Sequence, residues 1–240
     1  MRSVGTRSRS LLAGVAGLIG KHTTPLGTIP KQWFRPFLPA DPVIVEAGAH
    51  NGVDTVELSR LWPDGHVHAF EPVPDLYARL TARARKRPNI TCYPLALGDR
   101  DGPAEMFVSS GTSDGSSSLL RPTGHLVHHP TVTFSRSIRV QMTTLDTWAE
   151  AHGVDHVDLM WLDMQGAEMR MLQAAPRLLA TTRLVHMEVS LVELYADTPL
   201  YSEVRDWMEA HGLRVVAEAL AWSDGGNVLF ARYGDGLPRP

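Results

Sequence analysis

From residue 42 onward, short apolar runs alternate with segments in which apolar residues recur every three or four positions. The short runs end in small or acidic residues and indicate buried strands, whereas the longer spacing is typical of amphipathic helices. This alternation predicts an α/β fold. Strands are expected at residues 43–46, 66–71, 90–94, 157–163, 183–188, 213–218 and 227–232, and helices at 54–61, 74–87, 144–152, 167–174 and 201–211.

Two segments depart from this alternation. Residues 98–130 are rich in Gly, Ser, Asp and Pro, so we expect a hairpin and a long loop over the edge of the sheet rather than a linker between domains. Residues 138–142 would then form an edge strand. Residues 190–199 follow a strand without a clear helix cap, and a loop at this place is expected to carry substrate specificity.

The first 40 residues differ in charge from the rest. They contain no Asp or Glu and carry about +6 from their Lys and Arg residues. Their apolar run, residues 11–20, is about half of the ~20 residues that a membrane span requires, and no typical signal-peptide cleavage site follows it. We therefore predict no stable membrane insertion. The division expected is a basic, helical N-terminal arm over residues 1–40 and one catalytic domain over residues 41–240.

Composition narrows the class of protein further. The chain has 240 residues, of which 43% are hydrophobic, enough to bury one sizeable core. The formal net charge of −3 argues against a protein built to neutralise the phosphates of a nucleic acid. Cys92 is the only cysteine, which excludes an intramolecular disulfide and a multi-cysteine zinc site. A reducing, cytoplasmic setting fits best.

A glycine-containing turn follows the first predicted strand. Open α/β sheets bind ligands at this edge, and a dinucleotide site usually has the pattern G-x-G-x-x-G. Here His50 stands at the middle glycine, and Glu46 lies two residues before Gly48. These features favour a ligand with a cationic amino acid end, such as S-adenosylmethionine (SAM), although an incidental tight turn is an alternative. The residues expected to bind it are Glu46, Gly48, Ala49, His50, Asn51 and Gly52.

A second acidic residue ends the second predicted strand. Glu71 lies 23 residues after Gly48, where a carboxylate can accept hydrogen bonds from both hydroxyls of an adenosine ribose. Pro72 follows it. Phe70 on one side, and Ala96, Leu97 and Gly98 on the other, would form apolar walls for the adenine ring.

With the glycine-containing turn and this second acidic residue, the chain resembles the FkbM-type branch of the SAM-dependent methyltransferases. The resemblance implies a Rossmann-like class I fold, in which a seven-stranded, mostly parallel sheet with an antiparallel last strand has helices on both faces. It also implies SAM as cofactor, with Ser117 and Asp163 beside it, and methyl transfer to a hydroxyl of a carbohydrate, a glycoside or a polyketide-type product. The matching pieces are residues 45–52, 70–72, 96–99, 116–119, 144–146, 162–168 and 186–189.

Three residues depart from the family pattern. Glu46 stands where aspartate is commoner, Trp161 lies near a position that often holds lysine, and Gln165 replaces a usual glutamate. We expect cofactor binding to survive these changes. The orientation of the substrate and any acid-base role are less safely carried over from the family.

Methyl transfer to an alcohol needs a group that removes the proton of the hydroxyl. Asp163 and Glu188 end parallel strands, and Asn227 begins a strand of opposite direction, so all three are expected at one edge of the sheet. Oxygen ligands of this kind suit Mg²⁺. In the alternative, Asp163 only contacts SAM, Glu188 caps a loop and Asn227 turns the chain. His125 is the first candidate to take the proton, so the predicted catalytic residues are Asp163, Glu188 and His125.

We therefore expect an O-methyltransferase, a homodimer that acts on a small-molecule or oligosaccharide acceptor. Two alternatives remain. One is a nicotinamide-dependent oxidoreductase, which His50 and Glu46 argue against. The other is a catalytically silent SAM-binding module, because a fold does not by itself imply activity.

Overall fold

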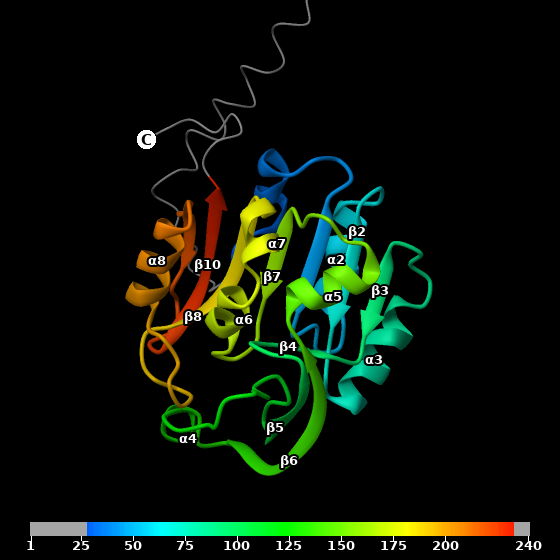
Figure 1. Cartoon of the computed structure of the whole chain (residues 1–240). Helices are drawn as coiled ribbons and strands as arrows, with labels where there is room; N and C mark the ends of the chain where they lie inside the picture. The colour runs from blue at the N-terminus through cyan, green and yellow to red at the C-terminus, as the bar shows by residue number, and fades with distance from the viewer. Residues whose placement is uncertain (1–27, 233–240) are drawn as a thin grey trace, which may run out of the picture.

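The computed structural model describes residues 28–232 of the chain. Its centre is a seven-stranded sheet with the order β3-β2-β1-β7-β8-β10-β9 (Figure 1). β10 is antiparallel to β8 and β9, and the other pairs are parallel, which confirms the predicted architecture. The strands are β1 Val43–Ala47, β2 His66–Phe70, β3 Ile90–Tyr93, β7 Leu159–Leu162, β8 Leu184–Ser190, β9 Leu213–Ala219 and β10 Gly225–Arg232.

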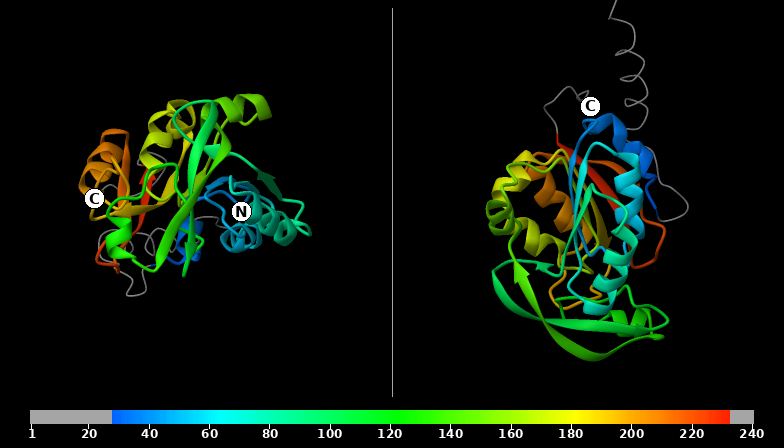
Figure 2. Two further views of the ribbon diagram at one scale, coloured as in Figure 1. Left: turned by 90° about the horizontal axis from the view of Figure 1, so that it is seen from below. Right: turned by 90° about the vertical axis from the view of Figure 1, so that its right-hand side faces the viewer.

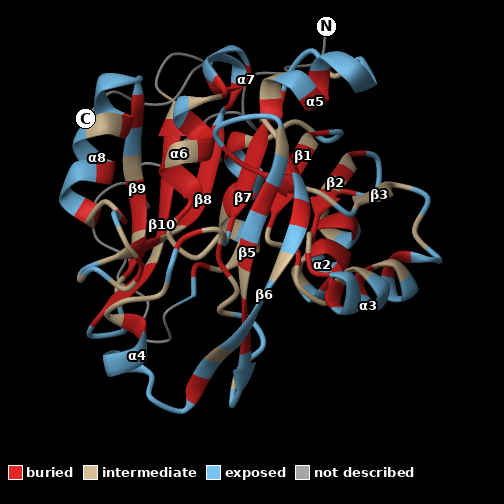
Figure 3. Ribbon diagram, turned by 60° about the horizontal axis from the view of Figure 1, so that its bottom comes forward, coloured by how far each residue is buried: buried red, intermediate tan, exposed pale blue. Residues whose placement is uncertain are grey.

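Helices cover both faces of this sheet, as expected (Figure 2). One face packs against α5 (Leu145–His152), α6 (Glu168–Gln173), α7 (Pro176–Thr181) and α8 (Tyr201–Ala210). The other is covered by a 3₁₀ helix, η1 (Lys31–Phe37), and by α2 (Val53–Leu61), with α3 (Pro74–Ala84) beside it. The central strands between these layers are buried, the edge strand β3 is half-buried, and the outer faces of the helices are exposed (Figure 3). The pattern of apolar residues in the sequence did not predict α7. The helix predicted over residues 74–87 is present as α3 but ends earlier, at Ala84.

A second sheet lies beyond the carboxyl ends of the parallel strands (Figure 1). It has the order β4-β6-β5, formed by β4 (Ala96–Leu97), β5 (Gly102–Gly111) and β6 (Val132–Thr143), with α4 (His125–His128) in the connection from β5 to β6. The hairpin predicted after residue 98 is present. Residues 138–142 are a strand, as predicted, but the prediction of an edge strand is wrong, because β6 lies between β4 and β5 in this second sheet.

A separate small core explains why the hairpin forms a second sheet. Met106 and Val108 of β5 pack with Val140 and Met142 of β6. They also pack against Val73 and Leu76 at the start of α3. The alternating apolar residues of this hairpin therefore have their own partners, and the hairpin does not need to join the main sheet.

The residues just before the first strand pack onto the domain. Ile29, Phe34 and Phe37 are buried against Ile44 and Leu58. Lys31 forms ion pairs with Asp54 and Glu57 of α2, at 2.5 and 2.7 Å. The apolar run 11–20 lies outside the described residues, and the division of the chain after residue 40 stays a prediction. Within residues 28–232 no helix is long and apolar enough to cross a membrane.

Candidate active site

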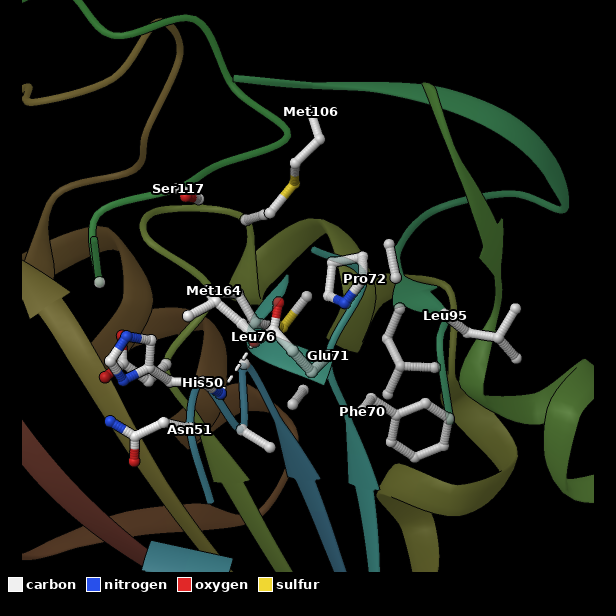
Figure 4. A pocket seen from close by; sticks show the side chains of 18 of the residues that line it. His50, Asn51, Phe70, Glu71, Pro72, Leu76, Leu95, Met106, Ser117 and Met164 are labelled. Atoms are coloured by element: carbon white, nitrogen blue, oxygen red, sulfur yellow. Dashed lines mark hydrogen bonds between the residues drawn. The ribbon is translucent and has the colours of Figure 1, made fainter. Parts of the chain in front are cut away.

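A cavity opens at the carboxyl ends of β1, β2 and β7, on the side where the second sheet lies (Figure 4). Its walls come from the turn after β1, the end of β2, the start of the second sheet, the loop between β5 and α4, and the end of β7. Most of the predicted cofactor-binding residues line it. They are Gly48, Ala49, His50, Asn51, Glu71, Pro72, Ala96, Leu97, Ser117 and Asp163.

The turn after β1 is clamped between its two neighbouring strands. The amides of Gly48 and Ala49 both donate to the carbonyl of Phe70, at 3.1 and 2.9 Å. On the other side, a Cβ added to Gly48 would lie 1.8 Å from the backbone oxygen of Asp163. Gly48 also has a φ of 81°. Only glycine fits both the close approach and the left-handed backbone at this position.

Glu71 is fixed by backbone amides. It is 4% exposed, and its carboxylate accepts from the amide of His50 and from that of Val73, both at 2.8 Å. Burial raises the pKa of Glu71 to about 7, although these two hydrogen bonds lower it. A carboxylate offers roughly four acceptor positions. Two acceptor positions are therefore left for hydroxyl groups in the cavity. We call residues 48–52 together with Glu71 the turn region.

The two ends of the cavity differ in polarity. Phe70, Pro72 and Leu95 form an apolar wall beside Glu71, whereas His50, Asn51 and Ser117 lie on the opposite side (Figure 4). Such a cavity suits a ligand with a flat apolar ring at one end and charged groups at the other.

Residues 112–124, which we call the covering loop, connect β5 to α4 and cross over the cavity. Asp114 in this loop binds the ring of His50 at 2.8 Å and the guanidinium of Arg79 at 2.9 Å. The bond to His50, and then the contact with Arg79, hold the pKa of Asp114 below its usual range. Neither Asp114 nor Arg79 is among the site residues that the sequence predicted. The available signal was that Asp114 is the one charged residue among the small and polar residues of 109–118.

Asp163 and Glu188 meet at the ends of β7 and β8, as predicted. The side-chain amide of Gln165 lies between them and donates to Asp163 Oδ1 at 2.7 Å and to Glu188 Oε2 at 2.5 Å. Asp163 is exposed to the cavity and Glu188 is half-buried, and desolvation by the surrounding protein raises the pKa of both carboxyls. The nearby Asp163 and Glu168 charges raise the pKa of Glu188 further. We call Asp163, Gln165 and Glu188 the carboxylate cluster.

The prediction of a magnesium site is not supported. Asn227 is the direct cross-strand partner of Glu188, so the three expected ligands do come from adjoining strands. The position between the two carboxylates, however, is filled by the amide nitrogen of Gln165, which satisfies one oxygen of each. In the described part of the chain, no group of three or more His, Cys, Asp and Glu side chains has a geometry that would hold a metal ion.

His125 is not brought to the cavity. It is 3% exposed in α4, where its ring contacts Phe134, Tyr195 and His129 at centroid distances of 5.2, 5.4 and 4.8 Å. Burial, and then the charge of His129, lower its pKa. His125 therefore packs as a buried core residue next to the second sheet. Its role as proton acceptor stays a prediction.

Three other predicted cofactor-binding residues lie next to the cavity wall rather than on it. Glu46 is 1% exposed and pairs in register with Trp161, and burial raises its pKa to about 8. Gly52 lies close to Leu80 of α3, and Gly98 packs against Met142 of β6. These three residues support the walls that the ligand would touch.

The strand order, with its antiparallel β10, and the cavity at the carboxyl ends define the fold of the SAM-dependent methyltransferases. The FkbM methyltransferase of Methylobacillus flagellatus KT has a similar structure, with a TM-score of 0.55 and 10% identity over 94% of this chain and 59% of that one. Fibrillarin in its complex with Nop5p is similar with a TM-score of 0.50 and 17% identity, over 82% of this chain and 75% of that one. At these identities the likeness shows the fold alone.

Comparison of the sequence identifies the family as well as the fold. The Methyltransferase FkbM domain matches residues 46–215, and the chain therefore belongs to this family. A curated relative, the 2-O-methyltransferase NoeI of Sinorhizobium fredii (strain NBRC 101917 / NGR234), is 32% identical over 160 residues. The matched part covers 65% of this chain and 66% of the relative, just under two thirds of that protein's length.

Proposed function

We propose that this protein transfers a methyl group from SAM to a hydroxyl oxygen of a carbohydrate or glycoside. The observation that carries the proposal is the cavity itself, with a glycine turn, a buried acceptor at Glu71 and the carboxylate Asp163 on its walls. Family membership supports methyl transfer, and the name of the 2-O-methyltransferase relative favours oxygen as the accepting atom.

The residues present fit SAM. The adenine would lie against Phe70 and Leu95, the ribose hydroxyls would donate to Glu71, and the methionine end would lie along residues 48–52. The missing side chain of Gly48 lets the turn lie against the backbone of Asp163, which keeps residues 48–52 at the cavity wall. When bound, SAM supplies the electrophilic methyl group on its sulfonium.

The chain's own residues would supply alignment and proton removal. The acceptor oxygen forms a bond to the methyl carbon as the carbon–sulfur bond breaks, and the hydroxyl proton must leave. Asp163 lines the cavity, and desolvation by the surrounding protein raises its pKa. These properties suit a direct base, because an acceptor with a raised pKa takes a proton more readily. We propose that Asp163 takes this proton.

Calorimetric titration with SAM and with NAD tests the cofactor. We expect SAM to bind and NAD not to bind; the reverse result would favour the nicotinamide-dependent oxidoreductase. Labelled methyl transfer is then measured on methyl glycosides of glucose, galactose, mannose and fucose, with a polyketide-type alcohol as comparison. Binding of SAM without any transfer would support the silent SAM-binding module.

Two further expectations belong to this proposal. The acceptor is a small molecule or an oligosaccharide, and the protein is a cytoplasmic homodimer. Sedimentation of the full chain gives the mass of the assembly directly, and a monomer at micromolar concentration would contradict the dimer.

A further inference from the structure

Gln165 has an unusual backbone for its residue type. Its φ is 54°, in the left-handed region that non-glycine residues adopt at a cost, and Gly166 follows with a φ of 94°. This reversal lies between the end of β7 and α6. It turns the Gln165 side chain back toward the carboxyl ends of β7 and β8, where the proposed reaction takes place. A strained residue at such a place indicates a function for its side chain.

Every polar atom of that side chain has a partner. The amide nitrogen donates to Asp163 and to Glu188, while Oε1 accepts from the hydroxyl of Tyr195 at 3.0 Å. The reverse orientation of the amide would place its oxygen against two carboxyl groups. The two carboxyls therefore favour the orientation in which both amide hydrogens face them, and Oε1 then faces the Tyr195 hydroxyl, whose one hydrogen it shares with the carbonyl of Ser116.

The same contacts reach the covering loop. The Tyr195 hydroxyl also lies 2.9 Å from the carbonyl of Ser116, and Ser118 Oγ donates to the backbone carbonyl of Gln165 at 2.8 Å. Tyr195 itself is 1% exposed and comes from the segment between β8 and α8. Gln165 thus joins three segments that are far apart in the sequence: the end of β7, the covering loop, and the connection after β8.

We propose that Gln165, hydrogen-bonded to Tyr195, is a positioning residue that holds Asp163 and Glu188 in their reactive arrangement and links this arrangement to closure of the covering loop. This inference rests on the proposed function, in which Asp163 takes the proton of the acceptor. A neutral amide can serve both carboxyls at once without adding charge. When the loop opens, the Gln165 backbone carbonyl loses its bond from Ser118 and Tyr195 loses Ser116, so the backbone turn that aims the amide at the carboxyls is no longer held.

The first test separates positioning from cofactor binding. Gln165→Leu and Gln165→Glu are compared with Gln173→Leu and Gln173→Glu, because Gln173 is an exposed glutamine of α6. For both Gln165 variants we expect kcat to fall by about 10- to 100-fold, the scale of a misplaced catalytic group. The Kd for SAM should stay within about 3-fold, since Gln165 lies away from the turn region. Unchanged kcat in either variant would overturn the proposal.

The second test measures the link to Tyr195. Tyr195→Phe removes one oxygen atom and keeps the ring in place, so it also serves if Gln165→Leu does not fold. Tyr77→Phe is the control, because it removes a hydroxyl bonded to the carbonyl of Cys92 at 3.4 Å. We expect Tyr195→Phe to lower kcat, and the double variant with Gln165→Leu to be no worse than Gln165→Leu alone. Additive losses would show that the two residues act independently.

The third test needs no acceptor. Hydrogen exchange of residues 112–120 is followed in the wild-type protein, in Gln165→Leu and in Tyr195→Phe, with SAM present and absent. Faster exchange of the covering loop in both variants supports the link, and equal exchange overturns it. If the wild-type protein neither binds SAM nor methylates a glycoside, the proposed function fails, whereas the exchange result still decides whether Gln165 and Tyr195 hold the loop.

Discussion

The turn region and the carboxylate cluster lie on the same cavity but are held by different kinds of interaction. In the turn region, backbone amides hold Glu71, and a backbone oxygen packs against Gly48. In the carboxylate cluster, side chains hold one another, and the amide of Gln165 is the common partner. The turn region is therefore built to keep one shape. The carboxylate cluster depends on residues from three distant segments, so it can respond to loop closure.

The largest effect is expected in the carboxylate cluster. Asp163→Asn keeps the shape of the side chain but removes the proton acceptor, so turnover should fall by about 10²- to 10⁴-fold. SAM affinity should change far less. Asp155→Asn, at an exposed position before β7, is the matched control.

The same assay tests the magnesium hypothesis against a direct base. With Gln165 between the carboxyls, we expect turnover of the wild-type protein to persist in excess chelator. Loss of activity that added Mg²⁺ restores would return the proton-removing role to a metal ion and contradict the assignment of Asp163 as direct base.

The next effect tests the rigidity of the turn region. Gly48→Ala places a methyl group against the Asp163 backbone at a φ of 81°. We expect it to cost at least about 3 kcal/mol of stability and to abolish SAM binding. Gly153→Ala is the control, because Gly153 also has a positive φ, of 67°, but a Cβ there would have no atom within 4 Å. If the two variants unfold at the same urea concentration, the close approach does not determine the turn.

Glu71 gives a smaller effect with a pH signature. Glu71→Ala should weaken SAM binding by about 1 to 3 kcal/mol, because a ribose hydroxyl would lose its acceptor. Burial raises the pKa of Glu71 to about 7 in the free protein, and ribose hydroxyls favour the ionised form. Binding therefore releases a proton, and affinity should fall as the pH drops through 7.

Calorimetry between pH 6 and pH 8 in buffers of different ionisation enthalpy measures this proton release. Glu150→Ala, at an exposed position of α5, should leave both the affinity and its pH dependence unchanged. If Glu71→Ala retained the wild-type pH dependence, another group would be responsible for it.

The smallest effect concerns the segment before β1. Lys31 bonds to Asp54 and Glu57 and lies 4.6 Å from the centre of the Trp161 ring, and Asp54 and Trp161 both line the cavity. Lys31→Met should cost about 1 kcal/mol of stability, since two of these partners are half-exposed and screened by solvent. Urea unfolding at low and high salt measures it, and a loss that does not shrink with salt would argue against an electrostatic origin.

The sequence by itself determined the parts that depend on short stretches of chain. Strand periodicity predicted the seven strands of the main sheet, and the spacing of Gly48 and Glu71 predicted residues that the structure places on the cavity wall. These features are local because a turn of fixed geometry needs particular residues at particular positions. The direction of the last strand came from the family resemblance rather than from periodicity.

Only the tertiary structure decided what lies around the carboxyls. The segment 102–143 has the alternation of a sheet edge, yet its apolar face packs on α3 and forms a second sheet. Gln165 is a single departure from the family pattern that the sequence shows. The role of its side chain, however, depends on Tyr195 and Ser116, which are 30 and 49 positions away. A hydrogen-bonding network of this kind depends on distances between segments, which the order of residues does not contain until the chain is folded.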